Sequence, residues 1–223
     1  MLSKNLEIFQ IFFLVTFSFF INKYYANFGV EPMDTFVLYN GGYKVLNGLI
    51  PFEDYWLTTG PLMDYLNAFF FFIGGVSWNT YTVHSSLFNV IITLGTYLFL
   101  KNLGLNIFYS TFYSLMFATL MYPVVGTPFV DHHATIFLLL SFYLFIIGIK
   151  KQNFKFFIYI PPILTLAFLC KQTPTSYGVI TILILGLAAF ILSKNKKDMF
   201  LNTLIGLIIT FFLLLIFFFF SKI

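Results

Sequence analysis

Four of the eight acidic side chains in the 223-residue sequence lie between residues 22 and 61: Glu31, Asp34, Glu53 and Asp54. A carboxylate within hydrogen-bond reach of a hydroxyl group can take its proton as a general base. The adjacent pair Glu53-Asp54 can also orient a loop or share a divalent ion. Simpler roles remain open, because Asp34 can cap a helix, Asp54 can be a turn residue and Glu31 can be a solvated loop acid.

Two further polar groups could take part in chemistry. Lys171 and Gln172 follow an apolar run, where a lysine can contact a phosphate or merely extend to the membrane surface. Asp131-His132-His133 precedes another apolar run. Neighbouring side chains on a helix point about 100° apart, so the two histidines do not easily bind one ion. His132 can contact an acceptor or a phosphate, or belong to an ordinary polar loop.

The composition defines the environment of these side chains. Hydrophobic residues make up 60% of the sequence and charged residues only 9%, whereas soluble domains have about 25% charged residues. A soluble enzyme, a nucleic-acid-binding protein and a disordered chain are therefore excluded, and an all-α polytopic membrane protein is predicted. All twelve basic residues are lysines, so no guanidinium is present to bind a phosphate in bidentate fashion. The single cysteine, Cys170, excludes an intrachain disulfide and a cysteine-rich metal site.

Polar residues separate eight apolar runs, of which seven are interpreted as spans. The run 62–76 is short, follows Pro61 and contains Asp64, which would cost roughly 2.5–3.5 kcal/mol at mid-bilayer. We therefore expect one transmembrane domain, residues 1–223, with the run 62–76 outside the membrane. The seven spanning runs are 6–21, 83–100, 106–125, 133–149, 154–170, 176–192 and 199–220.

The lysine positions orient these spans. With seven spans and a cytoplasmic N-terminus, eight of the twelve lysines are cytoplasmic and six of the eight acids are external, as the positive-inside rule favours. Eight spans with an external N-terminus would place nine lysines inside, so lysine counting alone does not decide. The short run 62–76 and the acidic first loop favour seven spans.

The expected external loop, residues 22–82, contains a predicted surface helix. Asp34 is expected at the N-cap of this helix, and Gly48 with Pro51 is expected to end it. Five apolar residues recur at spacings of three and four: Phe36, Tyr39, Tyr43, Leu46 and Ile50. This spacing places them on one face of a helix that lies flat on the outer membrane surface. Elsewhere, Pro161-Pro162 predicts a kink near one end of a spanning helix.

The same loop carries a longer pattern. Residues 33–35 read MDT, residues 42–56 read GYKVLNGLIPFEDYW and residues 60–66 read GPLMDYL. This pattern resembles the first external loop of the C-type glycosyltransferases, multi-span enzymes that use lipid-phosphate sugars. Bacterial members of the protein-mannosyltransferase-like branch often show an acidic residue, then G-x-x-L-x-x-G-x-x-P-Y-x-D, then G-P-L-x-Y-Y-L. Residues 166–173, LAFLCKQT, are similar to a second recurrent stretch.

The resemblance implies the seven-span core of that family, with the active site on the outer face of the bacterial cytoplasmic membrane. The donor would be a polyprenyl-phosphate sugar, and the acceptor a lipid, glycan or protein of the cell envelope. Asp34 matches the catalytic aspartate, and Asp54 with Glu53 matches the second acidic position. Lys171 and Gln172 become contacts for the donor phosphate. A divalent cation at the carboxylate pair stays open, and nucleic acid is not an expected partner.

Two alternatives stay open. Enzymes of this family usually continue with further spans and often a soluble domain, so the sequence is a core-only form, a fragment or a degenerate copy. The other function class is a non-enzymatic membrane protein: a transporter, a lipid-linked glycan flippase or an assembly partner. Transporters usually carry ionisable residues at mid-membrane, whereas here nearly every charge lies at the end of a run. His84, at the start of a run, is expected to be an interfacial histidine.

Overall fold

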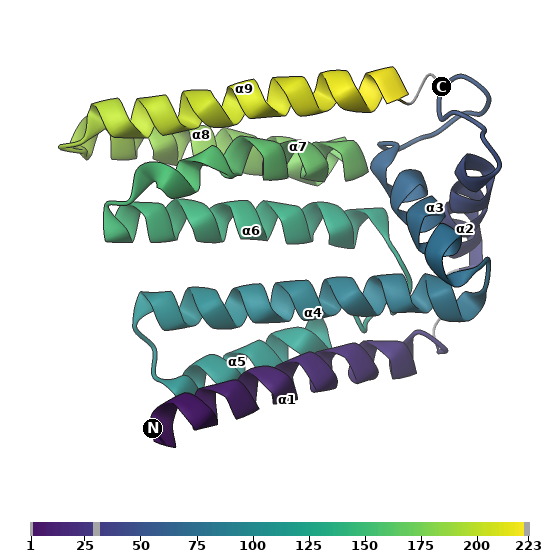
Figure 1. The fold of residues 1–223 in the computed structure, drawn as a ribbon, viewed down its shortest axis with the longest axis horizontal. Coiled ribbons are helices and arrows are strands. Elements are labelled where there is room, and N and C mark those ends of the chain that lie inside the picture. The colour runs from purple at the N-terminus through teal and green to yellow at the C-terminus, as the bar shows by residue number, and fades with distance from the viewer. Residues whose placement is uncertain (1, 29–31, 221–223) are drawn as a thin grey trace. The chain divides into compact units, whose positions relative to one another are not determined.

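The computed structural model describes residues 2–28 and 32–220, and every regular element within these ranges is helical. The predicted all-α fold class is therefore confirmed (Figure 1). In chain order the elements are α1 (Leu2–Tyr25), α2 (Pro32–Leu46), α3 (Leu62–Gly74), α4 (Trp78–Leu103), α5 (Ile107–Leu120), α6 (Val130–Lys151), η1 (Phe154–Ile158), α7 (Ile160–Cys170), α8 (Gln172–Leu192) and α9 (Lys196–Phe220).

Five of the described helices are long and apolar enough to cross a membrane: α1, α4, α6, α8 and α9. The chain is thus a multi-pass helical membrane protein. Two runs interpreted as spans form shorter helices, because α5 has 14 residues and α7 has 11, preceded by the short 3₁₀ helix η1. The run interpreted as external forms α3, which has only 13 residues.

The chain divides into two compact units, and each is described by itself. Unit 1 comprises Met1–Leu49 and Met63–His132, and unit 2 comprises Ile50–Leu62 and His133–Ile223. The expectation of one domain over residues 1–223 stays a prediction.

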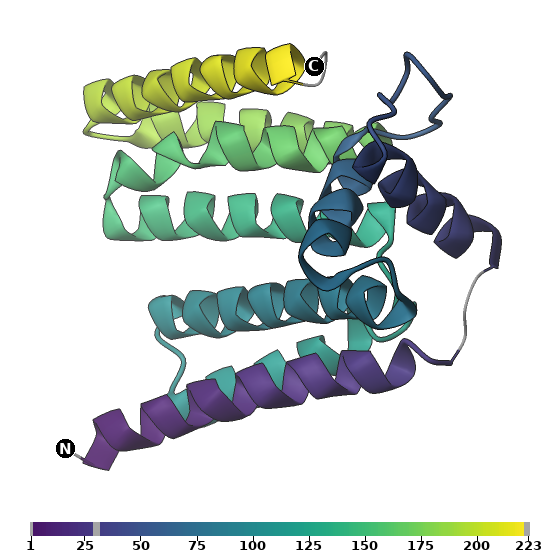
Figure 2. The same ribbon diagram turned by 45° about the vertical axis from the view of Figure 1, so that its right-hand side comes forward.

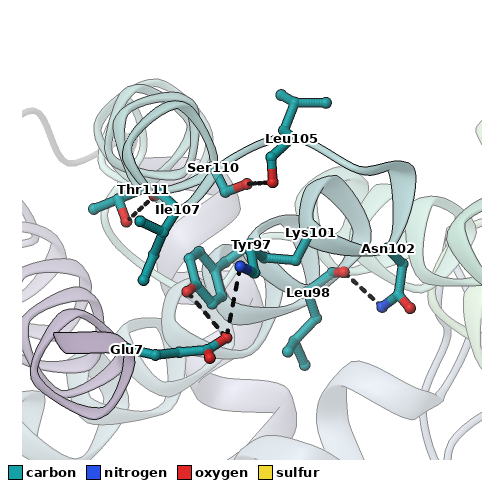
Figure 3. Close-up of polar contacts among 9 residues, drawn as sticks. All are labelled: Glu7, Tyr97, Leu98, Lys101, Asn102, Leu105, Ile107, Ser110 and Thr111. Carbon is teal, nitrogen blue, oxygen red and sulfur yellow. Dashed lines mark hydrogen bonds and ion pairs between the residues drawn. The ribbon is translucent and has the colours of Figure 1, made fainter. Parts of the chain in front are cut away.

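In unit 1, α1, α4 and α5 each pack against the other two, and α2 and α3 lie where α1 ends and α4 begins (Figures 1 and 2). Ser77 caps α4 by accepting a hydrogen bond from the Thr80 backbone N–H, and Gly104 ends it in a left-handed conformation with φ of 97°. Polar contacts join the beginning of α1 to the end of α4. There the Tyr97 hydroxyl lies 3.5 Å from Glu7 Oε1, and Lys101 Nζ lies 4.0 Å from the same oxygen (Figure 3).

Unit 2 is built around an aromatic and aliphatic core. Its buried members come from η1 and four helices: Phe145, Phe154, Phe157, Ile160, Ile182 and Met199. Pro161 and Pro162 occupy the first turn of α7, directly after η1. Proline is favourable there, because the first amides of a helix need no partner within it. The predicted kink is therefore a break between η1 and α7.

Candidate functional site

Asp34 lies in the first turn of α2 with an exposed side chain. The predicted N-cap position is wrong, because the helix already begins at Pro32, two residues earlier. Proline is well suited to a first helical position, since its φ is already close to the helical value. A carboxylate in this turn is stabilised by the positive end of the helix dipole. Glu31 lies outside the described residues.

The rest of unit 1 fixes α2 through a close contact with α3. A side chain at Gly41 would collide with the Asp64 carboxylate, and one at Gly42 would collide with Asn67. Asn67 Nδ2 donates a hydrogen bond to the Leu38 carbonyl at 3.1 Å. Two glycines therefore allow the helix that carries Asp34 to lie directly against a polar face of α3.

The face of α2 that was predicted to be apolar points away from the protein over part of its length. Phe36 and Tyr43 are 55% and 49% exposed, whereas Leu38 on the opposite side is buried. Tyr39 is half-buried against Tyr81, and burial raises the pKa of its hydroxyl above the usual value. Contact of the exposed face with a membrane stays a prediction.

His84 is fully buried, stacked on Phe70 at 4.4 Å with its Nδ1 2.7 Å from Asn67 Oδ1. Its expected place at the membrane interface stays a prediction. Asp64 is likewise only 2% exposed. From the sequence, Asp64 counted only as evidence against a span, and the burial of its carboxylate was not predicted. The spacing of three between Asp64 and Asn67, which places them on one helix face, was the available signal.

Glu53 and Asp54 are exposed in the segment Ile50–Leu62 of unit 2. Asp54 Oδ2 accepts a hydrogen bond from the Ile50 N–H at 2.7 Å. Phe52 has a left-handed φ of 69°, and its N–H donates to the Tyr55 carbonyl at 2.9 Å. Asp54 thus closes a tight loop, which is the turn role left open by the sequence. A ligand at Glu53 and Asp54 stays a prediction.

Lys171 and Gln172 lie at the junction of α7 and α8, as their place at the end of an apolar run suggested. Lys171 has extended backbone dihedrals, and Gln172 is the first residue of α8. Both side chains are half-buried. The Gly60 N–H donates to the Cys170 carbonyl at 3.1 Å. Unit 2 therefore binds the loop segment that carries Glu53 and Asp54 directly to the junction that carries Lys171.

An apolar groove extends along unit 2 from this junction. Helices α7, α8 and α9 line a cavity of about 540 Å³, which includes Leu169, two residues before Lys171, and reaches Phe218. A second apolar cavity, of about 340 Å³, continues toward Phe190 and Met199. The residues that the two cavities share are Ile160, Pro161, Ile182, Leu183 and Thr203. The lining suits a long hydrocarbon chain, for which a few polar groups near one end would define the orientation.

His132 belongs to unit 1 and lies in the first turn of α6. Its ring is half-buried, 5.2 Å from the Tyr122 ring and 5.6 Å from the Phe129 ring. Within residues 2–28 and 32–220, no group of three or more His, Cys, Asp or Glu side chains could hold a metal ion. A divalent cation at the carboxylate pair stays a prediction.

Four of the six predicted site residues thus belong to unit 2, where the backbone hydrogen bond from Gly60 to Cys170 joins the segment Ile50–Leu62 to the α7–α8 junction, whereas Asp34 and His132 belong to unit 1. Comparison with known proteins adds no relative: no family model, curated protein or solved structure matches the chain. What the fold defines is the class, a multi-pass helical membrane protein with polar segments at the ends of its helices.

Proposed function

We propose that the chain is a membrane glycosyltransferase, or the core of one, that acts on the outer face of the bacterial cytoplasmic membrane. It transfers a sugar from a polyprenyl-phosphate donor to a lipid, glycan or protein acceptor with inversion at the anomeric carbon. One arrangement in unit 2 carries the proposal. Leu169, two residues before Lys171, lines an apolar groove, and the loop segment with Glu53 and Asp54 is hydrogen-bonded at Gly60 to the junction that carries Lys171.

This arrangement matches the three chemical parts of such a donor. The groove along α7, α8 and α9 takes the isoprenoid chain, because its lining is apolar. The Lys171 ammonium and the Gln172 amide bind the phosphate. Glu53 and Asp54 accept hydrogen bonds from the sugar hydroxyls. The leaving phosphate is already a stable anion, so it needs cationic stabilisation and no proton.

Asp34 is the proposed general base. Its carboxylate takes the proton of the acceptor hydroxyl while the hydroxyl oxygen attacks the anomeric carbon. The bond between that carbon and the phosphate oxygen breaks, and polyprenyl phosphate leaves with the electron pair. The exposure of Asp34 on α2 supports this role, because the acceptor can reach it. His132 is proposed to contact the acceptor or the phosphate.

The proposal includes seven spans and a cytoplasmic N-terminus. Besides the five long helices, α5 and the η1–α7 segment would cross the membrane. Both are supported by packing within their units, since α5 lies along α1 and α4, and η1 and α7 lie along α9. The short α2 and α3 would lie at the outer surface. The exposed Trp56 and Phe36 are then interfacial anchors.

One observation favours the alternative class, a transporter or lipid-linked glycan flippase. Unit 1 buries the ionisable residues Asp64 and His84, and buried ionisable groups in membrane proteins are common in transport pathways. Asp64, however, lies on a helix of only 13 residues that the proposal places outside the bilayer. Transfer of the sugar to an acceptor, which a transporter or flippase does not carry out, distinguishes the two classes.

The test measures binding of radiolabelled polyprenyl phosphate to the purified 223-residue chain in nanodiscs. Lys171→Met should weaken binding at least about tenfold, because hydrogen bonds to charged groups contribute roughly 1.5–3 kcal/mol. Lys194→Met is the matched control, since Lys194 is an exposed lysine of the same unit that follows the far end of α8. Equal affinities of Lys171→Met and the wild-type chain would overturn the assignment of the donor site.

A further inference from the structure

The face of α4 that meets α1 and α5 in unit 1 is polar along most of its length. Its residues are at most 6% exposed and recur with helical spacing: Thr82, Ser85, Ser86, Asn89, Thr93 and Thr96. In a bundle that spans a bilayer, such groups must find hydrogen-bond partners inside the protein, because lipid supplies none. Each donor and acceptor of this face therefore needs a hydrogen-bond partner within the protein.

The amide groups of Asn22 and Asn89 and the hydroxyl groups of Ser85 and Ser86 all donate to partners within unit 1. Asn89 Nδ2 donates to the Ser18 carbonyl at 2.9 Å and to the Ala118 carbonyl at 3.0 Å, so both amide hydrogens have partners. Asn22 Nδ2 of α1 lies 3.0–3.1 Å from the Gly126 carbonyl and from two serine hydroxyl oxygens of α4. The hydroxyl hydrogens of these serines are directed at carbonyl oxygens of Thr82 and Gly126.

Where α1 and α4 meet, three polar atoms have no hydrogen-bond partner among the described residues: Asn22 Oδ1 of α1, and Asn89 Oδ1 and Thr93 Oγ1 of α4. All three residues are completely buried. Exchanging the oxygen and nitrogen of Asn89 is no remedy, because its oxygen would then face the carbonyls of Ser18 and Ala118. The orientation of the amide is therefore fixed, and its oxygen needs a donor from elsewhere.

Two of the three oxygens belong to successive turns of α4, and the third belongs to α1, which packs against α4. Asn89 and Thr93 are four residues apart on α4, which places their side chains roughly 5–6 Å apart on one face. Ser18, whose carbonyl binds Asn89, is one turn before Asn22 on α1. We propose that a short row of buried water molecules lies between α1, α4 and α5, bound by Asn22, Asn89 and Thr93. One water donates to Asn89 Oδ1 and contacts the Thr93 hydroxyl, and another donates to Asn22 Oδ1.

Water suits these ligands better than a cation does. The three oxygens belong to neutral amide and hydroxyl groups, whereas hard cations in proteins generally take six or more oxygens that include carboxylates. A buried water typically makes about three hydrogen bonds to polar groups that have no other partner. The row involves neither Asp34 nor Lys171 and does not rest on the proposed function.

The direct test is nuclear magnetic resonance of the full chain in detergent micelles with ¹³C-labelled threonine methyl groups. The Thr93 methyl should show a cross peak to water through space, and the peak should be lost in Thr93→Val, which assigns it. Thr210 is the matched control, because it is buried in unit 2 with its hydroxyl donating to the Gly206 carbonyl at 2.8 Å. No water cross peak is expected there. A Thr93 methyl without a water cross peak overturns the proposal.

Thermal unfolding gives an independent test of the buried water molecules. Valine keeps the shape of threonine but cannot hold the water, so Thr93→Val should lower the melting temperature by roughly 2–4 °C, the shift expected for about 1 kcal/mol in a chain of this size. If no water were bound, the buried Thr93 hydroxyl would lack a hydrogen-bond partner. Its replacement by a methyl group would then remove that desolvation cost and raise the melting temperature. An unchanged or higher melting temperature for Thr93→Val therefore contradicts the proposal.

Discussion

The two units use different interactions to hold membrane helices together. In unit 1, side-chain amides and hydroxyls join α1, α4 and α5, as when Asn22 binds both Ser85 and Ser86. In unit 2 the buried core consists of aromatic and aliphatic side chains. Three buried hydroxyls of unit 2 each donate to the carbonyl four residues earlier in their own helix: Ser141, Thr175 and Thr210.

The difference shows what each kind of interior can do. Hydrogen bonds are directional, so those between α1 and α4 fix the register of these helices in a medium that offers no hydrophobic driving force. The packing of unit 2 is not directional, and it leaves an apolar groove between α7, α8 and α9. The proposed function assigns lipid-chain binding to this groove of unit 2 and proton transfer to Asp34, which is exposed on α2 of unit 1.

The largest effect on stability is expected in the core of unit 2. Phe157 is 4% exposed, and its ring lies 5.4 Å from Phe145 and 5.5 Å from Phe154. Phe157→Ala should lower the free energy of unfolding by about 3–5 kcal/mol, because it removes apolar contacts and leaves a cavity. Equilibrium unfolding in detergent measures this change, with Phe212→Ala, at a 57% exposed position, as the control. Equal losses in the two variants would contradict the aromatic core.

A smaller effect separates the polar interior from the apolar one. Asn22→Leu should lower the free energy of unfolding by about 1–3 kcal/mol, because it leaves buried acceptors of unit 1 without their donor. Ser141→Ala in unit 2 should change it by less than about 0.5 kcal/mol, since a hydroxyl bonded to its own helix contributes little. Similar costs for both variants, in the same unfolding assay, would remove the distinction between the units.

Local patterns in the sequence predicted much of the fold. Composition and run length predicted a helical membrane protein, which the five long apolar helices confirm, whereas the count of seven spans stays a prediction because α3, α5 and the η1–α7 segment are all short. The position of Pro161-Pro162 predicted the break before α7. The start of α2 was misplaced because Asp34 suits both the N-cap and the first turn, and proline at position 32 favours the earlier start.

Contacts between distant segments could not be predicted. The hydrogen bond from Gly60 to Cys170, which joins the segment Ile50–Leu62 to the α7–α8 junction, connects residues that are 110 positions apart. The burial of His84 depends on Phe70 and Asn67 from another helix. Helical periodicity in one sequence shows that a residue lies on a given face, but not which helix packs against that face.

The central claim is tested most directly at Asp34. The 223-residue chain is reconstituted in vesicles with a radiolabelled polyprenyl-phosphate hexose and a cell-envelope extract. The measurement is the rate at which the chain transfers the labelled sugar to acceptors in the extract. Asp34→Asn should reduce this rate at least about a hundredfold, since a general base contributes roughly 10²–10⁴-fold, while binding of polyprenyl phosphate stays unchanged. Asp198→Asn, at an exposed first-turn aspartate of α9, is the matched control and should keep the wild-type rate. A rate for Asp34→Asn within about tenfold of the wild-type rate, too small a loss for a general base, or no transfer by the wild-type chain, would contradict the account.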